Sequence, residues 1–291
     1  MMIFKRINAL RQILKQDRFE KKSIGFVPTM GALHAGHLAL AHHSISSCAK
    51  TVFMIFVNPK QFCANEDFDV YPRNLVRDID LLEREGVDYC FAPSLDEMWP
   101  EGNETFVDTE YLSSILLGKQ RTGHFRGVTT ILAKAFNVVQ PDKAFFGEKD
   151  FQQLVIVRRM VKDLSFPIEI VGVPTWRHSD GLAASSRNLL LSDEDRKAAV
   201  IISQAWKEAD RYYNDGERCS VVLKRMTRDF LNREKRGTVE AIDLLDPSTL
   251  DVIEGSIKKT AVLLLAVRFG GVILIDQHIL GTIVHREGVY L

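Results

Sequence analysis

The chain has 291 residues, 46% hydrophobic and 26% charged, a composition typical of a globular protein that buries a core. Its 38 Lys and Arg balance its 38 Asp and Glu, so no global field attracts a polyanion, and we expect no nucleic-acid partner. The N-terminus lacks the apolar core of a signal peptide, and the longest apolar run, residues 260–267, is far below the roughly 20 residues that span a bilayer, so we expect no membrane association.

The first 175 residues alternate short β-rich runs with runs of helical periodicity. The predicted strands are 24–29, 51–58, 87–93 and 142–147, and the predicted helices are 37–49, 74–86, 127–141 and 150–164. A βαβα succession of continuous apolar strands is typical of a parallel sheet with helices on both faces. We therefore predict an α/β fold with a Rossmann-like parallel sheet in the N-terminal domain.

The pattern changes after Pro174. One long helix is predicted over 192–216, with Ser192 as its N-cap, and a second helix runs to about Glu234. Three β-rich runs follow, at 238–246, 259–270 and 272–280. The glycines between the last two runs predict a hairpin, so the chain is expected to close with a smaller α+β domain.

The boundary between the two domains is expected in the polar stretch at 175–190. We predict a Rossmann-like domain over 1–176 and a C-terminal α+β lid domain over 177–291.

The cysteines are scattered, with no CxxC pair and no His spacing suited to zinc, at Cys48, Cys63, Cys90 and Cys219. This favours a reduced, cytoplasmic setting and no protein-held metal. Cys48 and Cys90 are expected to pack as small hydrophobic residues, whereas Cys63 lies in a polar loop near a candidate site.

Three polar segments follow predicted strands, at the edge where open parallel sheets bind ligands. They are PTMGALHAGH at 28–37, NPKQF at 58–62 and FGEKD at 146–150. In the first, His34 and His37 lie at the start of a helix, where backbone N–H groups and the helix dipole favour phosphate. The alternative is two ordinary surface histidines, which is the expectation for His42 and His43 deeper in the helix. The pattern indicates chemistry on a nucleoside triphosphate.

A longer set of runs resembles the pantothenate synthetase family, the pantoate and β-alanine ligases of the HxGH nucleotidyltransferase superfamily. The matching runs are PTMGALHAGH, NPKQF, NEDFDVYPR at 65–73, GHFRGVTT at 123–130, FGEKDFQQLVIVRRM at 146–160 and DGLAASSRN at 180–188. They cover most of the first 190 residues in the family's order, and the C-terminal third is similar only in length and general pattern.

The resemblance implies a two-step reaction within pantothenate and coenzyme A biosynthesis. ATP adenylates the carboxylate of (R)-pantoate and releases pyrophosphate, and the amine of β-alanine then attacks the pantoyl adenylate to give pantothenate and AMP. It also implies that the domain over 1–176 binds the nucleotide and pantoate. Mg²⁺ with the ATP, small molecules as the only substrates, and a homodimer in the cytoplasm are implied as well.

The resemblance implies catalytic roles for His37, His34, Lys149 and Arg187, with His37 as the proton donor. The implied ATP contacts are Met30, Gly31, Ala32, Leu33, His34, Ala35, Gly36, His37, Gly147, Glu148, Lys149, Asp150, Trp176, Ala184, Ser185, Ser186 and Arg187. Gln61 and Gln153 map onto the family's pantoate-binding glutamines, and Gln61 also onto the β-alanine site.

Two positions depart from the family pattern. Ala184 stands where a Met usually precedes SSRN, and Ala35 stands where an acidic residue is common. If that Met packs over the nucleotide, Ala184 weakens ATP binding modestly, and Trp176 fills some of the space. For the gem-dimethyl group of pantoate, Met30 and Phe62 are the candidate apolar contacts.

Two other functions stay open at this point. A different HxGH enzyme, which adenylates another small molecule, is favoured if Gln61 and Gln153 face away from the cleft. A nucleotide-binding protein without catalysis is favoured if His34 or Lys149 cannot reach bound ATP. The neutral net charge argues against an aminoacyl-tRNA synthetase.

Overall fold

A computed structural model describes residues 1–62, 68 and 71–282. The contacts among residues divide the chain into two compact units, Met1–Gly147 with Gln152–Val173, and Glu148–Phe151 with Pro174–Leu291. The division into functional domains at residues 176 and 177 stays a prediction. Cys63 and most of the NEDFDVYPR run lie outside the described residues.

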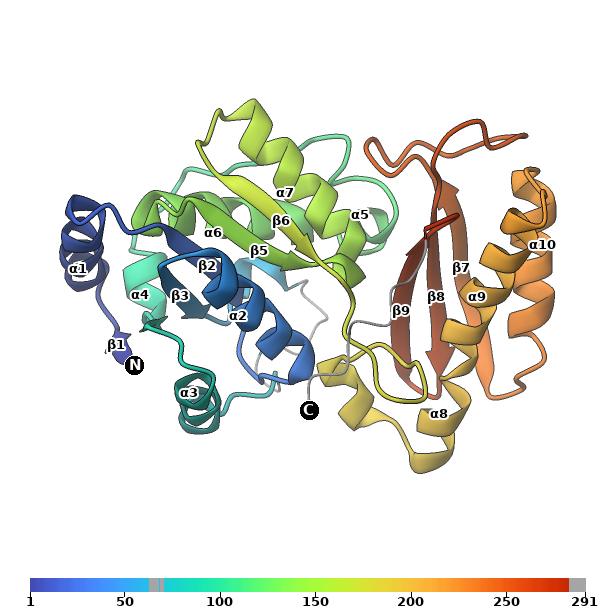
Figure 1. Ribbon diagram of the computed structural model, residues 1–291, viewed down its shortest axis with the longest axis horizontal. Helices are drawn as coiled ribbons and strands as arrows, with labels where there is room; N and C mark the ends of the chain where they lie inside the picture. The colour runs from blue at the N-terminus through green and yellow to red at the C-terminus, as the bar shows by residue number, and fades with distance from the viewer. Residues whose placement is uncertain (63–67, 69–70, 283–291) are drawn as a thin grey trace. The chain divides into compact units, whose positions relative to one another are not determined.

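The first unit is built on a six-stranded parallel sheet of order β1-β4-β3-β2-β5-β6 (Figure 1). Its strands are β1 Met2–Phe4, β2 Ile24–Thr29, β3 Lys50–Ile55, β4 Tyr89–Phe91, β5 Lys143–Gly147 and β6 Glu169–Val173. Its helices are α1 Ile7–Phe19, α2 Ala35–Ser47, α3 Leu75–Arg84, α4 Leu95–Met98, α5 Leu117–Gln120, α6 His124–Val139 and α7 Phe151–Asp163, with a 3₁₀ turn η1 at Pro59–Gln61. The predicted parallel sheet and all four predicted strands, β2 to β5, are confirmed; the edge strands β1 and β6 had not been predicted.

Both faces of the inner strands β2, β3, β4 and β5 are buried, which explains their continuous apolar runs. Successive residues of β2 point to opposite faces. The ring of Phe26 meets Phe136 of α6 edge-on, with ring centroids 6.1 Å apart. Val27 packs in a cluster with Leu40 of α2 and Leu82 of α3. Strand β2 is thus held between helices on both sides.

The strand order reverses direction at β2. The chain passes from β2 to its neighbour β3 on one side, and later returns to β5 on the other side. The carboxyl ends of β3, β2 and β5 are therefore adjacent, and the three polar segments singled out in the sequence begin at these ends. A topological switch point of this kind is where ligands bind in open α/β sheets.

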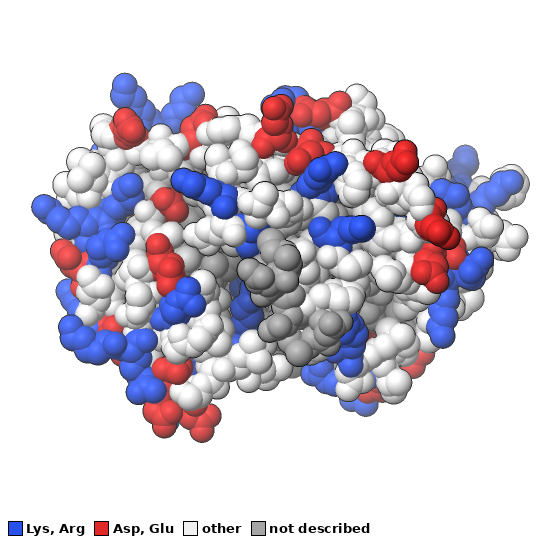
Figure 2. Space-filling view, turned by 180° about the vertical axis from the view of Figure 1, so that it is seen from behind, with Lys and Arg blue, Asp and Glu red and all other residues white. Residues whose placement is uncertain are grey.

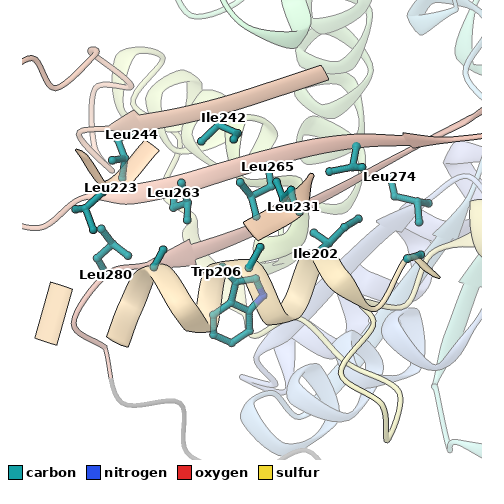
Figure 3. Close-up of a cluster of buried hydrophobic side chains, with 14 of the residues drawn as sticks. Ile202, Trp206, Leu223, Leu231, Ile242, Leu244, Leu263, Leu265, Leu274 and Leu280 are labelled. Carbon is teal, nitrogen blue, oxygen red and sulfur yellow. The ribbon is translucent and has the colours of Figure 1, made fainter. Parts of the chain in front are cut away.

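The second unit is a three-stranded antiparallel sheet of order β7-β8-β9 with helices packed on one face. Its elements are η2 Glu148–Asp150, η3 Ser186–Leu190, α8 Asp193–Ala198, α9 Ile201–Asn214, α10 Ser220–Leu231, β7 Gly237–Leu245, β8 Val262–Phe269 and β9 Val272–Ile279. Figure 3 shows its core, a cluster that includes Ile202 and Trp206 of α9, Leu223 of α10 and Leu263 and Leu265 of β8. The predicted hairpin is confirmed, since Phe269 pairs with Val272 across the two glycines.

The prediction of one helix over 192–216 was wrong, because the structure has two helices there. Ser192 is the N-cap, as predicted, and its Oγ accepts the N–H of Asp195 at 3.1 Å. The helix then breaks at Ala199 and Val200, where the N–H groups of Ile202 and Ser203 bond to carbonyls three residues back. The hydroxyl of Ser203 also donates to the carbonyl of Val200 at 3.0 Å, and such a local bond competes with the helical pattern.

Within the described ranges, no helix combines the length and apolar character needed to cross a membrane. On the face drawn in Figure 2, Lys and Arg side chains are interspersed with Asp and Glu. This mixing agrees with the balanced charge of the sequence and leaves no broad surface of one sign on that face.

Candidate functional site

A buried carboxylate of α3 stabilises the conformation of the turn between β2 and α2. Gly31 and Ala32 both adopt left-handed backbone conformations, with φ of 84° and 52°. Asp78, only 1% exposed, accepts the N–H of Ala32 at 2.8 Å and the N–H of Leu33 at 2.9 Å. A Cβ on Gly31 would lie 3.0 Å from the same carboxylate, so glycine suits this position on both counts.

His34 and His37 cap α2 reciprocally at its N-terminus. Nδ1 of His34 accepts the N–H of Gly36 at 3.1 Å, and Nδ1 of His37 accepts the N–H of His34 at 3.3 Å. The two rings lie with their centroids 4.1 Å apart. Because each Nδ1 is an acceptor, each neutral imidazole carries its proton on Nε2. Both side chains are therefore fixed as Nε2–H donors beside the positive end of a helix.

Gln61 lies on η1, directly after β3, and its side chain meets the turn after β2. Its Nε2 donates to Sδ of Met30 at 2.9 Å, and its Oε1 accepts from Nδ2 of Asn58 at 3.1 Å. Asn58 is 1% exposed and also binds the carbonyl of Gly127 and the indole N–H of Trp99. Gln61 and Met30, which the resemblance assigned to neighbouring ligands, thus lie in direct contact.

Two residues of this cluster were missed by the sequence analysis. Nδ1 of His124, at the start of α6, donates to the backbone carbonyl of Gln61 at 2.7 Å. Arg121 donates to Nε2 of His124 at 3.3 Å and to the same carbonyl at 3.4 Å. The sequence did contain a signal for His124, because this residue lies within GHFRGVTT, one of the runs that match the family. The resemblance assigned it no role. Gly127 admits the close contact of α6 with η1, since a Cβ there would lie 2.1 Å from the carbonyl of Lys60.

Gln153 stands apart from these contacts. It is half-buried in the first turn of α7, and its amide makes no hydrogen bond with any side chain or backbone group in the described ranges. The neighbouring Gln152 is the structural amide, since it bonds to the backbone of Leu112, Ile115 and Leu117. The structure therefore separates two adjacent glutamines, one committed to packing and one available for a ligand.

In the second unit, Lys149 and Ser185 line one small pocket. The Lys149 side chain is 15% exposed, and its ammonium lies 3.4 Å from Oδ1 of Asp150. Ser185 is the N-cap of η3, and its Oγ accepts the N–H of Arg187 at 3.3 Å. The guanidinium of Arg187 is exposed and makes no bond with another part of the chain that the structure describes.

The segment before η3 folds back on itself. Arg177 pairs with Ala183 in an antiparallel bridge, and the N–H of Ala184 donates to the carbonyl of Trp176 at 2.9 Å. This bond brings together two of the implied ATP contacts, and Ala184 is 6% exposed. In the same segment, burial lowers the pKa of His178, and the nearby Arg196 lowers it further.

This segment is fixed to β9 by a buried ion pair. Arg177 donates to both carboxylate oxygens of Asp276, which is 3% exposed. The same carboxylate accepts the indole N–H of Trp206 at 3.2 Å and the N–H of Gln277 at 2.8 Å. Asp276 thus carries no uncompensated charge into the pocket that it shares with Lys149.

Potential metal ligands and reactive thiols are two further features of the described residues. The described residues contain no cluster of three or more His, Cys, Asp or Glu arranged to hold a metal ion. Cys90 is fully buried, and burial raises the pKa of its thiol to about 12. This agrees with the expectation that Cys90 packs as a hydrophobic residue, since a thiol with so high a pKa is a poor nucleophile.

Comparison with known proteins covers nearly the whole chain. The family model described as pantoate-beta-alanine ligase matches residues 2–279. The pantothenate synthetase of Bartonella quintana is 58% identical over 278 residues, which are 96% of this chain and 97% of that protein. The pantothenate synthetase of Brucella anthropi is 47% identical, with 99% of both chains covered.

Two solved structures are similar in fold. Pantothenate synthetase from Thermus thermophilus superposes with a TM-score of 0.89 at 42% identity, covering 96% of this chain and 99% of that one. Pantoate-beta-alanine ligase from Francisella tularensis gives a TM-score of 0.78 at 31% identity, covering 96% and 97%. That enzyme was crystallised with a β-γ ATP ligand and β-alanine. The likeness extends through the C-terminal third, where the sequence motifs alone had been least specific.

Proposed function

The chain belongs to the pantoate–β-alanine ligase family and condenses pantoate with β-alanine using ATP; we propose that it does so through a pantoyl adenylate. In the first step the carboxylate of (R)-pantoate attacks the α-phosphorus of ATP, and the bond to the leaving pyrophosphate breaks. In the second step the amine of β-alanine attacks the acyl carbon and AMP leaves. The products are pantothenate, AMP and pyrophosphate.

The observation that carries this proposal is the reciprocal capping of His34 and His37. Both Nδ1 atoms are engaged by backbone N–H groups, so both Nε2–H groups are preorganised donors at the end of the central strand. Negative charge grows on the phosphate oxygens as pyrophosphate leaves, and donors fixed in advance stabilise that charge more than they stabilise the ground state. His37 is the proposed proton donor and His34 its partner on the phosphates.

The remaining proposed ATP contacts follow the same logic. The cationic Lys149 and Arg187 and the hydroxyls of Ser185 and Ser186 would bind phosphate oxygens. The turns at 30–37 and 147–150 would approach the nucleotide with their backbone, and Asp150 would accept from ribose hydroxyls. The paired backbone of Trp176 and Ala184 is the proposed support for adenine.

For pantoate we propose the amides of Gln61 and Gln153. An amide both donates to a carboxylate and accepts from a hydroxyl, and it does so without a charge that would stabilise the carboxylate before it reacts. Gln61 is already oriented by Asn58, and its contact with Met30 sets an apolar group beside the amide. Gln61 is also the proposed contact for β-alanine, and Met30 and Phe62 remain the proposed contacts for the gem-dimethyl group.

The amine of β-alanine must lose a proton before it attacks. An alkyl ammonium has a pKa near that of Lys, about 10.4, so only a small fraction is nucleophilic at neutral pH. Holding that fraction next to the adenylate raises its effective concentration, and this proximity is the contribution that we assign to the protein in the second step.

Mg²⁺ is proposed to enter with the nucleotide. Because the described residues form no cage of carboxylates or imidazoles, they suit a cation held mainly by the phosphate oxygens of ATP, which is a common mode for this ion. Bound there, it would neutralise part of the charge on the phosphates. From the family resemblance we also propose that the protein is a homodimer and is located in the cytoplasm.

Isotope exchange between pyrophosphate and ATP tests the first step by itself. With Mg²⁺ and (R)-pantoate present and β-alanine absent, exchange that depends on pantoate is the expected result. Folded protein that binds ATP but shows no exchange would contradict the adenylate proposal. Exchange supported by a different carboxylic acid and not by pantoate would indicate another HxGH enzyme.

A further inference from the structure

Asn188 presents a buried amide oxygen for which the described residues offer no donor. Its Nδ2 donates to the carbonyl of Ala183 at 3.0 Å. This bond fixes the orientation of the amide, so that Oδ1 is the other, buried atom, and it has no hydrogen-bond partner within the described ranges. A buried acceptor without a donor is energetically unfavourable. We therefore expect a polar group in the same pocket to donate to this oxygen when the enzyme is at work.

That pocket contains three other polar residues, Lys149, Ser185 and Asp276. Asp276 is an acceptor only, and it is occupied by Arg177 and Trp206. The oxygen of the Ser185 hydroxyl is held in the η3 cap as the acceptor of the Arg187 N–H, its O–H makes no bond to Oδ1 of Asn188, and the short side chain cannot move there without leaving the cap. The ammonium of Lys149 has three N–H groups on a flexible side chain, and its bond to the half-exposed Asp150 is long, at 3.4 Å. Lys149 is therefore the donor in this pocket that matches the oxygen of Asn188.

We propose that Asn188 is a positioning residue for Lys149. In the nucleotide-bound enzyme, Oδ1 of Asn188 accepts one N–H of the Lys149 ammonium and directs the other two toward phosphate oxygens of ATP. The inference rests on the role proposed above for Lys149. It explains why an amide occupies this position and why its oxygen is buried at a pocket that Lys149 also lines.

A neutral acceptor suits this task better than a carboxylate. An amide oxygen orients the ammonium and leaves its charge intact, whereas a carboxylate would form an ion pair that competes with phosphate. Among the described residues that line the pocket, Asp276 is the one carboxylate, and its two bonds to Arg177 hold it away from this role. The pocket thus keeps the charge of Lys149 available for the nucleotide.

A double-mutant cycle on ATP affinity tests the proposal. The full-length chain, Asn188→Ala, Lys149→Met and the double variant are titrated with ATP and Mg²⁺ by calorimetry. We expect Asn188→Ala to weaken ATP binding about tenfold in the native background, the size expected for a hydrogen bond to a charged group. In the Lys149→Met background the same substitution should change affinity less than about twofold, because the group on which it acts is gone.

A purely structural role predicts a different pattern. If Asn188 acted only through its bond to Ala183, Asn188→Ala would weaken ATP equally in both backgrounds, and the proposal would be overturned. It would also be overturned if Asn188→Ala left the affinity of the native chain unchanged. If Lys149→Met alone left the ATP affinity unchanged, the proposed role of Lys149 in phosphate binding would be refuted. This outcome is distinguishable from a failure of the Asn188 proposal, which is read from the coupling between the two substitutions.

Two further variants protect the interpretation. Asn232→Ala removes an exposed asparagine in the same unit and should leave ATP affinity unchanged. If Asn188→Ala does not fold, as judged by thermal melting, the cycle is run with Asn188→Ser, which is polar but too short to place an oxygen at the same point. The expected coupling with Lys149→Met is the same.

Discussion

Arg177 and Asp276 lie 99 positions apart in the chain, yet the guanidinium meets the carboxylate through two hydrogen bonds of 2.7 and 2.8 Å. The planar guanidinium matches the two carboxylate oxygens, and Trp206 and Gln277 complete the shell of donors. The pair ties the segment that carries Ser185 to strand β9.

Asp276→Asn should therefore destabilise the second unit strongly. It leaves Arg177, whose side chain is 18% exposed, without its counter-charge, and breaking one partner of a buried pair costs about 3–5 kcal/mol. The matched control is Asp163→Asn, which breaks the exposed pair with Arg159 and should cost about 1 kcal/mol or less. Urea unfolding followed by tryptophan fluorescence measures both, and equal losses would refute the assignment.

Asp78→Asn should impair catalysis through the turn that it holds. The N–H groups of Ala32 and Leu33 bond to different oxygens of the carboxylate, so an amide in its place would meet one N–H with its oxygen and the other with its NH₂. We expect a stability loss of about 1–3 kcal/mol. A shift of the following His34 should slow pyrophosphate–ATP exchange by up to about 100-fold.

The control for this substitution is on the same helix. Asp80→Asn removes an exposed carboxylate that pairs with Arg84, and it should change neither exchange nor stability appreciably. If Asp78→Asn exchanged as fast as Asp80→Asn, the turn would not depend on the buried carboxylate.

His34→Asn should separate catalysis from folding. The Asn side chain can accept the N–H of Gly36 and so preserves the helix cap, but it lacks the Nε2–H donor. We expect exchange to fall about 10²- to 10³-fold with little change in melting temperature. His43→Asn, which alters a histidine bonded to the carbonyl of Ala39, should leave the exchange rate nearly unchanged. Comparable rates for the two variants would remove His34 from the proposed mechanism.

The second unit should lose stability in mild acid because of His278. Burial lowers the pKa of this imidazole from 6.5, and the nearby Arg177 lowers it further, while Asp210 and Asp276 oppose the shift. The unfolded chain then binds a proton more readily than the folded chain. The contribution of His278 is thus fully present above about pH 6.5 and is lost as the pH falls below that value.

The variant that checks this pH dependence is His278→Gln. His278 stacks on Trp206 with ring centroids 4.3 Å apart, so the variant should be less stable at every pH. The free energy of unfolding, measured between pH 8 and pH 5, should fall less steeply for the variant than for the native chain. Parallel curves would show that His278 is not the titrating group.

Much of the fold was predictable because it depends on local patterns. The apolar run of β2 predicts a buried strand, and the two glycines between β8 and β9 predict a hairpin. Both predictions are confirmed. The break at Ala199 was missed because the residues around it have good helical periodicity, and nothing local indicates a pair of tighter turns. The predicted start of α2 was close, since the His34 cap is itself a local feature.

The candidate site was predictable only in its motif residues. Asp78 reads in the sequence as an ordinary carboxylate of an amphipathic helix, and its partners lie 45 and 46 positions earlier. Asn188 lay within a quoted run, but its unpaired oxygen is a property of packing. Sequence motifs identify the groups that meet a ligand, whereas the residues that hold those groups in place emerge only from long-range contacts.

The position of β2 between β3 and β5 also bears on how the chain is made. The N–H of Ile24 donates to the carboxylate of Asp142, 118 positions later, and β2 pairs with β5 in the same region. A growing chain therefore exposes one bare edge of its central strand until about half of the protein has been synthesised. Pairing between segments far apart in the chain slows folding, and an unpaired strand edge makes the folding intermediate prone to aggregation. The edge of β2 that adjoins β5 can therefore be completed only after Lys143 and Ala144 have been made.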